Sequence, residues 1–515
     1  MTLAQLLERA ARRRPSADAV VDGARRLSYE DLAGQGARLA RGFARLGVTR
    51  GDRVMIALRN RLEHVLAYWA LQMIGGVPAP VNFRLAAEEM RYVLEDCGAA
   101  VVLLEAATAP VVLEAAAGRP VRLVFVGSDA PPGALAFSEV LALGDGKGDP
   151  GRDLVEGDLS LILYTSGTTG RPKGVPRTHK NHTAGALAHV IQCGYGWLER
   201  TLGVMPLYHT MGIHSLTSMA AVNGCFVCQP DWSAAGALEL IASERLTALY
   251  LIPTLFHDLV HAPEFSAAKV GSVRKLAYAG ASMLAPLTEA CVTAFRPEVF
   301  VNHYGSTEIY TFSVRPDVHN KPGCAGRPGI HSTLKVVVAS TDRRVGPVET
   351  VPPGEKGEIV ASLDSDEAFA GYWQRPDADA RALRDGWYFT GDMGYIDAEG
   401  ELFVSGRVDD MIITGGENVH PVEVEDVLAR HPQVRDVAVV GEPDEKWGER
   451  VVAFVVPATA TVTAAALDAH CRESRDLANF KRPRRIVFVK EIPKTASGKI
   501  LRRLLREGQY MEVQG

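Results

Sequence analysis

Residues 159–174 read Leu-Ser-Leu-Ile-Leu-Tyr-Thr-Ser-Gly-Thr-Thr-Gly-Arg-Pro-Lys-Gly, an apolar run followed at once by a loop of small and hydroxylated residues. The apolar half predicts a buried β-strand at 159–164. Small residues let backbone N–H groups close around phosphate oxygens, the hydroxyls of Ser166, Thr168 and Thr169 add donors, and Lys173 adds a positive charge. The stretch therefore predicts a phosphate-binding loop rather than a plain surface turn. It lacks the spacing of the P-loop NTPases.

The segments before this loop alternate between helical and strand patterns. Such alternation is typical of parallel sheets covered by helices, whose ligands bind at the C-terminal ends of the strands. We therefore expect an α/β fold with the glycine loop at such an end. The expected helices are 29–46, 63–74 and 86–97, with another inside 1–15, and the expected strands are 53–58, 77–81 and 99–104.

The pattern changes near residue 400 to short strands, single helices and a hairpin. This change predicts a large domain at 1–406, a hinge at 407–410 and a small α+β domain at 411–515. The expected elements are strands at 402–405 and 411–413, a helix at 422–429, a hairpin of 436–440 with 451–456, and a helix at 500–506.

Length and composition describe a large globular protein. The chain has 515 residues, of which 47% are hydrophobic and 23% charged, enough for about three folding units. The net charge of -5, without a long Lys/Arg run, argues against a nucleic-acid partner or an anionic membrane surface.

The cysteines and the apolar segments of the sequence indicate the cellular compartment of the protein. The seven cysteines are odd in number and sparse, which favours reduced thiols. Cys225 and Cys228 have the spacing of a metal or redox pair, but strand alternation places them on opposite faces, so neither role is expected. The uncharged run 65–83 contains glycines and prolines and favours a buried helix turning into a strand over a membrane span. The N-terminus lacks the order of a signal peptide, and we expect a cytoplasmic protein.

Four further motifs follow in order along the chain: Tyr304-Gly-Ser-Thr-Glu308, Tyr388-Phe-Thr-Gly-Asp392, Gly406-Arg-Val-Asp-Asp410 and Pro493-Lys-Thr-Ala-Ser-Gly-Lys499. With the glycine loop, they resemble the adenylate-forming superfamily of acyl-CoA synthetases, adenylation domains and firefly luciferase over nearly the whole chain. Residues 205–209, 406–418 and 478–483 are similar to its 4-chlorobenzoate–CoA ligase branch. The resemblance implies an ATP-dependent ligase that converts a carboxylic acid to an acyl-AMP, releases pyrophosphate and passes the acyl group to coenzyme A.

The resemblance also implies the residues of the first half-reaction. Lys499 would bridge the carboxylate and the α-phosphate, and Glu308 would hold Mg²⁺ through its hard carboxylate oxygens. The remaining implied catalytic residues are Thr307, Lys173 and His209. The implied ATP/AMP site comprises Thr165, Ser166, Gly167, Thr168, Thr169, Gly280, Ala281, Ser282, Asn302, His303, Tyr304, Gly305, Thr307, Asp392, Arg407 and Lys499.

For the second half-reaction, the family rotates its C-terminal domain about a hinge aspartate, which is Asp409 here. Gly415, Gly416, Glu417 and Trp447 would then border the tunnel for the pantetheine arm, where a Cβ atom would narrow the path. Arg84, Phe480 and Arg482 would bind the CoA nucleotide, because guanidinium groups suit phosphates and an aromatic ring suits adenine. A plain β-turn at the two glycines and ordinary surface arginines are the alternatives.

The acid itself is the weakest inference. By resemblance, the acyl pocket comprises Tyr208, His209, Thr210, Met211, Tyr250, Ala279, Gly280, His303, Gly305 and Tyr310. Aromatic and small residues together suit a flat ring, so a benzoate-type acid is expected. Thr210, His303 and Tyr310 add polar groups, which predict a hydroxyl or amino substituent unless these groups satisfy one another.

Several alternatives stay open at this point. An adenylation enzyme that loads a carrier protein shares the first half-reaction, but Arg84, Phe480 and Arg482 favour free CoA because a carrier presents no adenine. An aliphatic acyl-CoA synthetase and a luciferase-like oxygenase differ in the acyl pocket. An inactive nucleotide-binding protein is disfavoured because every motif is intact. The assembly is open between a monomer and a homodimer.

Overall fold

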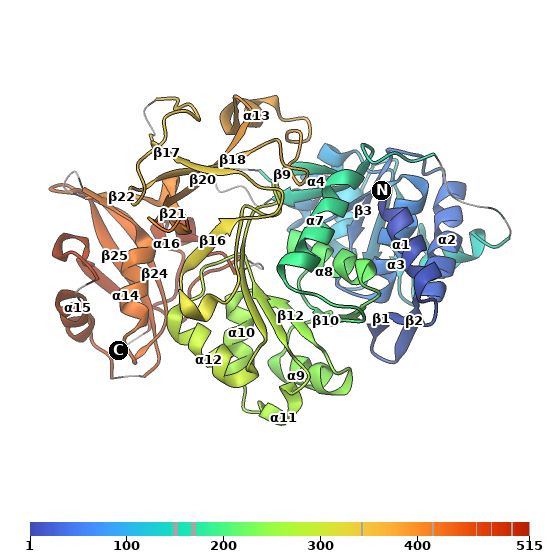
Figure 1. The fold of residues 1–515 in the computed structure, drawn as a ribbon. Helices are drawn as coiled ribbons and strands as arrows, with labels where there is room; N and C mark the ends of the chain where they lie inside the picture. Colours follow the sequence, from blue (N-terminus) through green and yellow to red (C-terminus); the bar gives the residue numbers. More distant parts are fainter. Residues whose placement is uncertain are drawn as a thin grey trace.

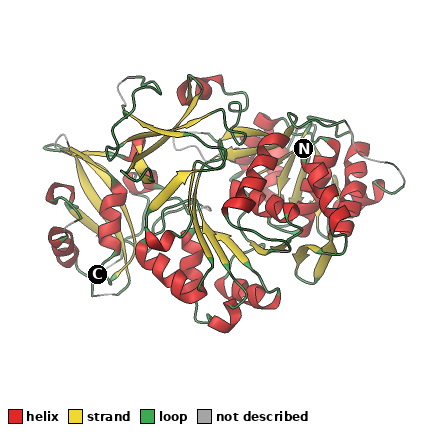
Figure 2. Cartoon of the chain, in the orientation of Figure 1, coloured by secondary structure: helices red, strands yellow, loops and turns green. Residues whose placement is uncertain are grey.

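The computed structural model describes residues 1–146, 148, 153–165, 171–340, 343–414, 417–459, 461–474, 476–495 and 498–513, apart from the side chains of Asp409 and Asn418. Figure 1 shows a large body built from the N-terminal four-fifths of the chain and a small body, coloured orange to red, at its side. Sheets flanked by helices make up the large body (Figure 2).

The largest sheet has fourteen described strands and a parallel half joined to an antiparallel half. The parallel half runs from β14 to β1, and the strands beyond β14 in the other direction are antiparallel. In spatial order the strands are β17 (Leu334–Val337), β18 (Gly357–Ser362), β20 (Trp387–Ile396), β21 (Leu402–Arg407), β16 (Cys324–Pro328), β15 (Ser313–Arg315), β14 (Val299–Tyr304), β13 (Lys275–Tyr278), β12 (Ala248–Leu251), β10 (Arg200–Gly203), β11 (Cys225–Cys228), β1 (Asp18–Asp22) and β2 (Arg25–Ser28), with β19 (Leu383–Arg384) paired to β20.

A second sheet is entirely parallel and confirms the α/β expectation for the N-terminal region. Its helix α3 is buried along nearly its whole length, which explains why residues 65–83 carry no charge. Helix α2 begins at Tyr29 because Ser28 and Asp31 form a capping box. The sheet is β4 (Val77–Pro80), β3 (Arg53–Ala57), β5 (Val101–Glu105), β6 (Arg122–Val126) and β7 (Ala134–Ala136), and the N-terminal helices are α1 (Leu3–Arg13), α2 (Tyr29–Arg45), α3 (Leu62–Ile74), α4 (Ala87–Cys97), α5 (Ala109–Ala116) and α6 (Phe137–Leu143).

The strand before the glycine loop differs from the expectation. β8 (Leu159–Thr165) pairs antiparallel with β9 (Lys173–Thr178) in a two-stranded sheet, so the loop joins a hairpin and does not end a parallel strand. The pairing sets Thr165 opposite Lys173. The apolar pattern of the strand is the same in both arrangements, so the pattern alone did not show that its partner would be the next strand in an antiparallel hairpin.

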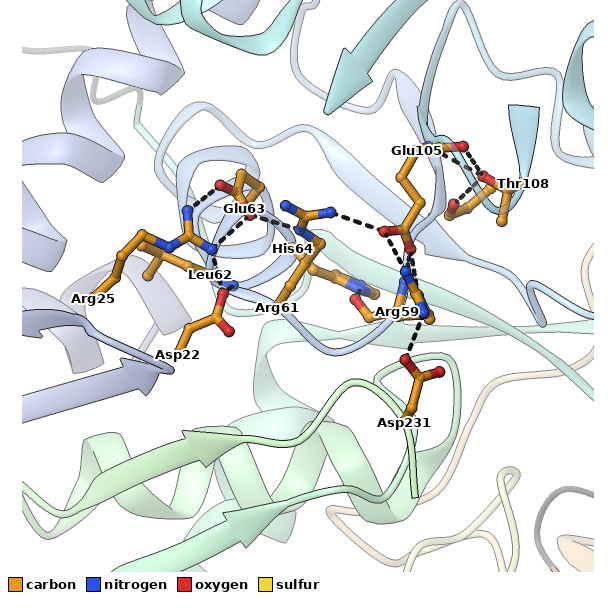
Figure 3. Close-up of polar contacts among 11 residues, drawn as sticks. Asp22, Arg25, Arg59, Arg61, Leu62, Glu63, His64, Glu105, Thr108 and Asp231 are labelled. Atoms are coloured by element: carbon orange, nitrogen blue, oxygen red, sulfur yellow. Dashed lines mark hydrogen bonds and ion pairs between the residues drawn. The ribbon is translucent and has the colours of Figure 1, made fainter. Parts of the chain in front are cut away.

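An ion-pair network connects the second sheet to the largest one (Figure 3). Glu105, at the end of β5, is 2% exposed and accepts from the backbone N–H of Arg59 (2.7 Å) and from Arg61 Nη1 (2.8 Å). Arg59 also reaches Asp231 after β11, at 2.6 Å. A buried carboxylate needs such donors to offset the loss of water. The network lines a cavity of about 220 Å³ whose arginines are all paired with carboxylates.

The small body contains a separate five-stranded sheet: β23 (Glu417–Val419), β22 (Ile412–Thr414), β25 (Gly448–Pro457), β24 (Val434–Asp444) and β26 (Arg485–Phe488). Its helices are α14 (Pro421–Ala429), α15 (Ala464–Glu473) and α16 (Arg502–Arg506). The β24–β25 hairpin is longer than expected, and α16 begins two residues late because Ile500 forms a β-bridge with Lys494. The boundaries at 406, 407–410 and 411 stay predictions.

The helices around the parallel half of the largest sheet are α7 (His179–Gln192), α8 (Thr210–Ala221), α9 (Ala234–Ser243), α10 (Pro253–Val260), α11 (Ala267–Val270) and α12 (Ala285–Phe295). Helix α13 (Pro376–Ala382) contacts β19 and β20 in the antiparallel half. Cys225 and Cys228 are buried free thiols in β11, and burial raises the pKa of both. In the described part of the chain, no helix combines the length and the apolarity needed to cross a bilayer.

Candidate active site

Three residues predicted for the nucleotide meet at the centre of the largest sheet. The Tyr304 hydroxyl at the end of β14 donates to Asp392 Oδ2 at 2.7 Å. Arg407 Nη1, at the end of β21, donates to Asp392 Oδ1 at 2.6 Å and to the carbonyl of Thr390 at 3.1 Å. These donors fix the orientation of the carboxylate, which suits an acceptor for the two hydroxyls of a ribose.

A second group joins the glycine-loop hairpin to the 304–308 motif through Tyr372. The Tyr372 hydroxyl donates to Glu308 Oε1 at 2.7 Å, and Lys173 Nζ lies 4.1 Å from the centre of the Tyr372 ring. Burial lowers the pKa of Lys173, and the charge of Glu308 opposes that shift. Among the described residues no donor bonds Glu308 Oε2, so this hard oxygen suits Mg²⁺. Sequence reasoning missed Tyr372, because it belongs to none of the quoted motifs.

A buried arginine holds the backbone of the same motif. Arg177 on β9 is 2% exposed, and its Nη1 donates to the carbonyls of Thr307 (2.8 Å) and Glu308 (3.0 Å). Burial lowers the pKa of Arg177 to about 10, so the group stays charged at neutral pH. Arg177 therefore fixes the position of the two predicted catalytic residues. Its sequence signal is weak, because one arginine in a strand is normally a surface group.

Lys499 of the small body lies within electrostatic reach of Asp392 and Arg407, two residues of the large body predicted to bind the nucleotide. Burial lowers the pKa of Lys499, with Arg407 acting in the same direction and Asp392 and Asp410 acting against it. The preceding Gly498 touches the large body, since a Cβ atom there would lie 3.0 Å from Ile252 Cδ1. The loop is closed by a bond from the Lys499 backbone N–H to Thr495 Oγ1 at 3.0 Å.

Three residues predicted for the acyl pocket, His209, Thr210 and Met211, lie at the start of α8. The His209 Nδ1 accepts from the backbone N–H of Met211 at 3.3 Å, and burial lowers the pKa of His209 to about 4. The neutral ring therefore carries its proton on Nε2 and presents a donor. Thr210 Oγ1 donates to Thr307 Oγ1 at 3.4 Å. Gly280 is exposed and has a φ of +85°, whereas Ala279 beside it is buried.

The polar side chains that were expected to bind a substituent of the acid are hydrogen-bonded to other residues of the protein. His303 Nε2 bonds Thr311 Oγ1 at 3.1 Å, and the Tyr310 hydroxyl bonds His189 Nδ1 at 2.9 Å and the Tyr250 hydroxyl at 3.3 Å. For His303 and Tyr310, the condition for a hydroxyl or amino preference, polar groups left unpaired, is not met, whereas the Tyr208 hydroxyl of the same predicted pocket is buried and has no hydrogen-bond partner among the described residues. The partners come from distant segments, so the sequence did not reveal them.

The residues predicted for CoA stay apart. Arg84 stacks on the Phe83 ring at 4.7 Å, whereas Arg482 pairs with Asp468 inside the small body. Trp447 and Phe480 are 46% and 40% exposed, and Glu417 is exposed on β23.

Several predicted residues lie outside the described residues, namely Ser166, Gly167, Thr168, Thr169, Gly415 and Gly416, together with the side chain of Asp409. Of the remaining nucleotide residues, Thr165 ends β8, Ala281 and Ser282 follow β13, Asn302 bonds the carbonyl of Cys324, and Gly305 lies against the Tyr310 carbonyl.

Two family models cover these same regions. The model of the AMP-binding enzyme matches residues 7–373, and that of the AMP-binding enzyme C-terminal domain matches residues 423–499. The chain belongs to the family of AMP-binding enzymes. This AMP-binding enzyme is 35% identical over 512 residues to a 4-chlorobenzoate–CoA ligase of Arthrobacter sp, covering 98% of the chain and 95% of the relative. It is 36% identical to a feruloyl-CoA synthase of Amycolatopsis sp, covering 96% of each. A long-chain-fatty-acid–CoA ligase of Mycobacterium tuberculosis is 32% identical, with 94% of the chain and 93% of the relative covered.

Solved structures agree with this assignment. An anthranilate CoA ligase in complex with anthranoyl-AMP superposes with a TM-score of 0.91 at 28% identity, covering 99% of this chain and 97% of that one. The fold of the AMP-binding enzyme, with its large and small bodies, is therefore that of a known acyl-adenylate-binding protein.

Proposed function

We propose that this AMP-forming acid–thiol ligase activates a benzoate-type acid as its acyl-AMP and passes the acyl group to coenzyme A. One observation carries the proposal: Lys499 lies half-buried within electrostatic reach of Asp392 and Arg407, although it comes from the other body of the molecule. A lysine held at a ribose-binding carboxylate can neutralise charge as it develops at the adjacent α-phosphate.

In the first half-reaction, a carboxylate oxygen attacks the α-phosphorus of ATP and the bond to pyrophosphate breaks. The roles assigned to individual residues are part of the proposal. Lys499 would stabilise the transition state, and Oε2 of Glu308 would hold Mg²⁺, which would offset the charge of the departing pyrophosphate. The Nε2–H of His209 would orient the incoming carboxylate. Tyr372 and Arg177 would position Glu308 and its backbone.

In the second half-reaction, the sulfur of CoA attacks the acyl carbonyl, the thiol proton is lost and AMP leaves. We propose that the small domain first rotates about Asp409, which withdraws Lys499 and brings the face of Glu417 and Trp447 to the acyl site. The exposed rings of Trp447 and Phe480 support this step, because exposed aromatic side chains suit contact with a ligand. Arg84 and Arg482 would bind the CoA phosphates.

The aromatic preference rests on the aromatic side chains of the predicted acyl pocket. The relatives named above act on aryl and on fatty acids, so family membership alone leaves the acid open. Tyr250, Tyr310 and His303 give the pocket flat, polarisable walls, which suit a ring. Since these groups are already hydrogen-bonded, we propose no hydroxyl or amino requirement, and His303→Ile should leave the ranking of substituted benzoates unchanged.

The test is a pyrophosphate-release assay over benzoates, cinnamates, straight-chain acids and dicarboxylates, followed by addition of CoA to the acyl-AMP formed. We expect benzoates to give the highest kcat/KM and CoA alone to consume the acyl-AMP. Pyrophosphate release without thioester formation from CoA would support a carrier-protein acceptor instead. A higher kcat/KM for straight-chain acids would overturn the aromatic preference.

A further inference from the structure

Residues 365–372 lie between β18 and α13, at the top of Figure 1, and none of the motifs of the sequence contains them. We call them the 365–372 segment. Its Phe369 and Tyr372 side chains belong to the same apolar cluster as Ile309, which directly follows Glu308 in the chain. The segment therefore packs against the stretch of chain that carries the predicted Mg²⁺ ligand.

The 365–372 segment also bonds that ligand directly. The backbone N–H of Phe369 donates to the carbonyl of Glu308 at 2.9 Å, and Ala368 forms an antiparallel β-bridge with Ile309. Tyr372 adds the hydrogen bond to the Glu308 carboxylate that is described above. The segment thus holds both the backbone and the side chain of Glu308.

Glu367 holds the other end of the same stretch of chain. Its side chain is fully buried, and Oε2 accepts from the backbone N–H of Thr311 at 2.8 Å. Its Oε1 has no hydrogen-bond partner among the described residues, and the charge of Arg177 lies within electrostatic reach. A buried carboxylate with a single hydrogen bond is costly, so apolar packing alone does not explain a glutamate at this position. The bond to Thr311 is an interaction that an apolar side chain could not make.

Asn181 fixes the 365–372 segment to the N-terminus of α7. Its Nδ2 donates to the carbonyls of Asp366 and Ala368, both at 2.9 Å. Its Oδ1 accepts from the backbone N–H of Thr178 at 3.0 Å as part of the capping box of α7. One buried side chain therefore ties the segment to a helix, which gives Glu367 a rigid support.

We infer that Glu367 is a positioning residue for adenylation, which fixes the chain at Thr311 so that Glu308 is correctly placed to hold Mg²⁺ with ATP. The inference rests on the proposed function and adds to it a residue outside all the motifs. The chain from Glu308 to Thr311 is held at its first residue by Phe369 and at its last by Glu367, so loss of the second bond frees one end. Residues that orient a metal ligand typically change metal affinity or activity by about 10- to 100-fold when they are replaced.

Two substitutions at Glu367 separate the hydrogen bond from the volume of the side chain. Glu367→Met removes the acceptor and keeps most of the buried volume, whereas Glu367→Gln keeps an acceptor oxygen. We measure pyrophosphate release by the full-length protein at increasing Mg²⁺ concentration, with the acid that gives the highest kcat/KM in the screen above. The Mg²⁺ concentration for half-maximal rate should rise about tenfold or more in Glu367→Met. It should stay within about twofold of wild type in Glu367→Gln, because the bond to Thr311 is kept.

Two further readouts distinguish positioning from general loosening of the fold. Calorimetric titration with ATP, in the presence and absence of Mg²⁺, needs no turnover, and the gain in ATP affinity that Mg²⁺ gives to wild type should shrink about tenfold in Glu367→Met. Thioester formation from supplied acyl-AMP and CoA should stay within about threefold of wild type, because pyrophosphate has already left.

The matched control is Glu105→Met. Glu105 is also buried and also accepts from a backbone N–H, but it lies in the ion-pair network of Figure 3. Its Mg²⁺ requirement should equal that of wild type. An equal rise in Glu105→Met and Glu367→Met would overturn the inference, because loosening of the large body would then be the cause.

Asn181→Asp tests the same support from its other end and replaces Glu367→Met if that variant does not fold. The new carboxylate keeps the bond to Thr178 but repels the two carbonyls of the 365–372 segment, so the Mg²⁺ requirement should rise. Glu308→Gln gives the reference for loss of the ligand itself.

The failure of the inference and that of the proposed function differ in these measurements. If Glu308→Gln raises the Mg²⁺ requirement while Glu367→Met and Asn181→Asp leave it unchanged, the positioning role is wrong and the proposed function stands. An equal loss in Glu367→Gln and Glu367→Met would also overturn the role, because the acceptor bond would then make no difference. If wild type releases no pyrophosphate with any acid, the proposed function itself fails.

Discussion

Gly498 and Ile252 are in contact across the two bodies of the molecule, with 3.0 Å between a Cβ atom built on Gly498 and Ile252 Cδ1. Gly498 also has a φ of +78°, a conformation that favours glycine. The adjacent Lys499 is thereby brought towards Asp392 and Arg407, which are predicted to bind the nucleotide. The small body is thus positioned for the adenylation step of the proposed reaction.

Gly498→Ala should therefore slow adenylation by about tenfold or more, because the new methyl group pushes the loop away from Ile252 and also strains the backbone. Gly508→Ala is the matched control: Gly508 has a φ of +75° and nothing within 4 Å of its built Cβ atom. Stopped-flow measurement of pyrophosphate release checks both. If both variants slowed adenylation equally, backbone strain and not the contact with Ile252 would be the cause.

Lys499→Ala should lose adenylation by about 10²-fold or more, since the charge on the transition state loses its partner. Thioester formation from supplied acyl-AMP and CoA should stay within about threefold of wild type, because rotation withdraws this lysine. Single-turnover rates of the two half-reactions decide the matter. A similar loss in both would contradict the rotation model.

Lys356 of the large body lies 3.3 Å from Glu423 of the small body, and Lys481 contacts the same carboxylate at 2.8 Å from within the small body. Lys356→Ala should destabilise the present arrangement of the two bodies, the one proposed for adenylation, by about 0.2–1 kcal/mol, as expected for a partly exposed ion pair. Adenylation should therefore slow by up to about fivefold. The effect should fade at high salt. Lys481→Ala should leave the adenylation rate unaltered, because its bond does not cross between the bodies.

Arg177→Met should lower the free energy of unfolding by about 2–3 kcal/mol, because the carbonyls of Thr307 and Glu308 lose a charged donor in a buried position. Adenylation should fall as well, since both predicted catalytic residues shift with their backbone. Urea unfolding and pyrophosphate release measure the two effects. Arg343→Ala, at an exposed pair with Glu349, should leave the free energy of unfolding nearly unchanged.

Glu367 predicts a pH dependence of stability. Burial raises the pKa of Glu367 from 4.5 to about 7, although it accepts from the backbone N–H of Thr311 at 2.8 Å. The folded state therefore holds a proton that the unfolded state releases, so the free energy of unfolding falls as pH rises from about 4.5 to about 7 and is level above. Relative to Glu367→Gln, wild type should lose about 3 kcal/mol over this window. Urea titrations at several pH values test this, with the exposed Glu264→Gln as control, and parallel curves for wild type and Glu367→Gln would refute it.

The sequence by itself determined the type and order of most elements and the motifs that mark the family. Helix α2 and strand β3 were predictable because a capping box and an apolar run are local features of the chain. The motifs ending at Glu308, Asp392 and Lys499 were readable because their residue types and spacing are themselves the signal. Family membership followed from those motifs without knowledge of any contact.

Tertiary structure decided which groups meet. The role of Arg177 in holding the 304–308 backbone and the bonds from Tyr310 to His189 and Tyr250 join segments far apart in the chain. The periodicity of apolar residues shows that a side chain is buried, but it does not show which side chains it packs against. Many different apolar surfaces of the protein could cover the same apolar face equally well. For that reason the sequence predicted polar groups in the acyl pocket, whereas only the packing of α7, α8, β12 and β14 showed that these groups satisfy one another.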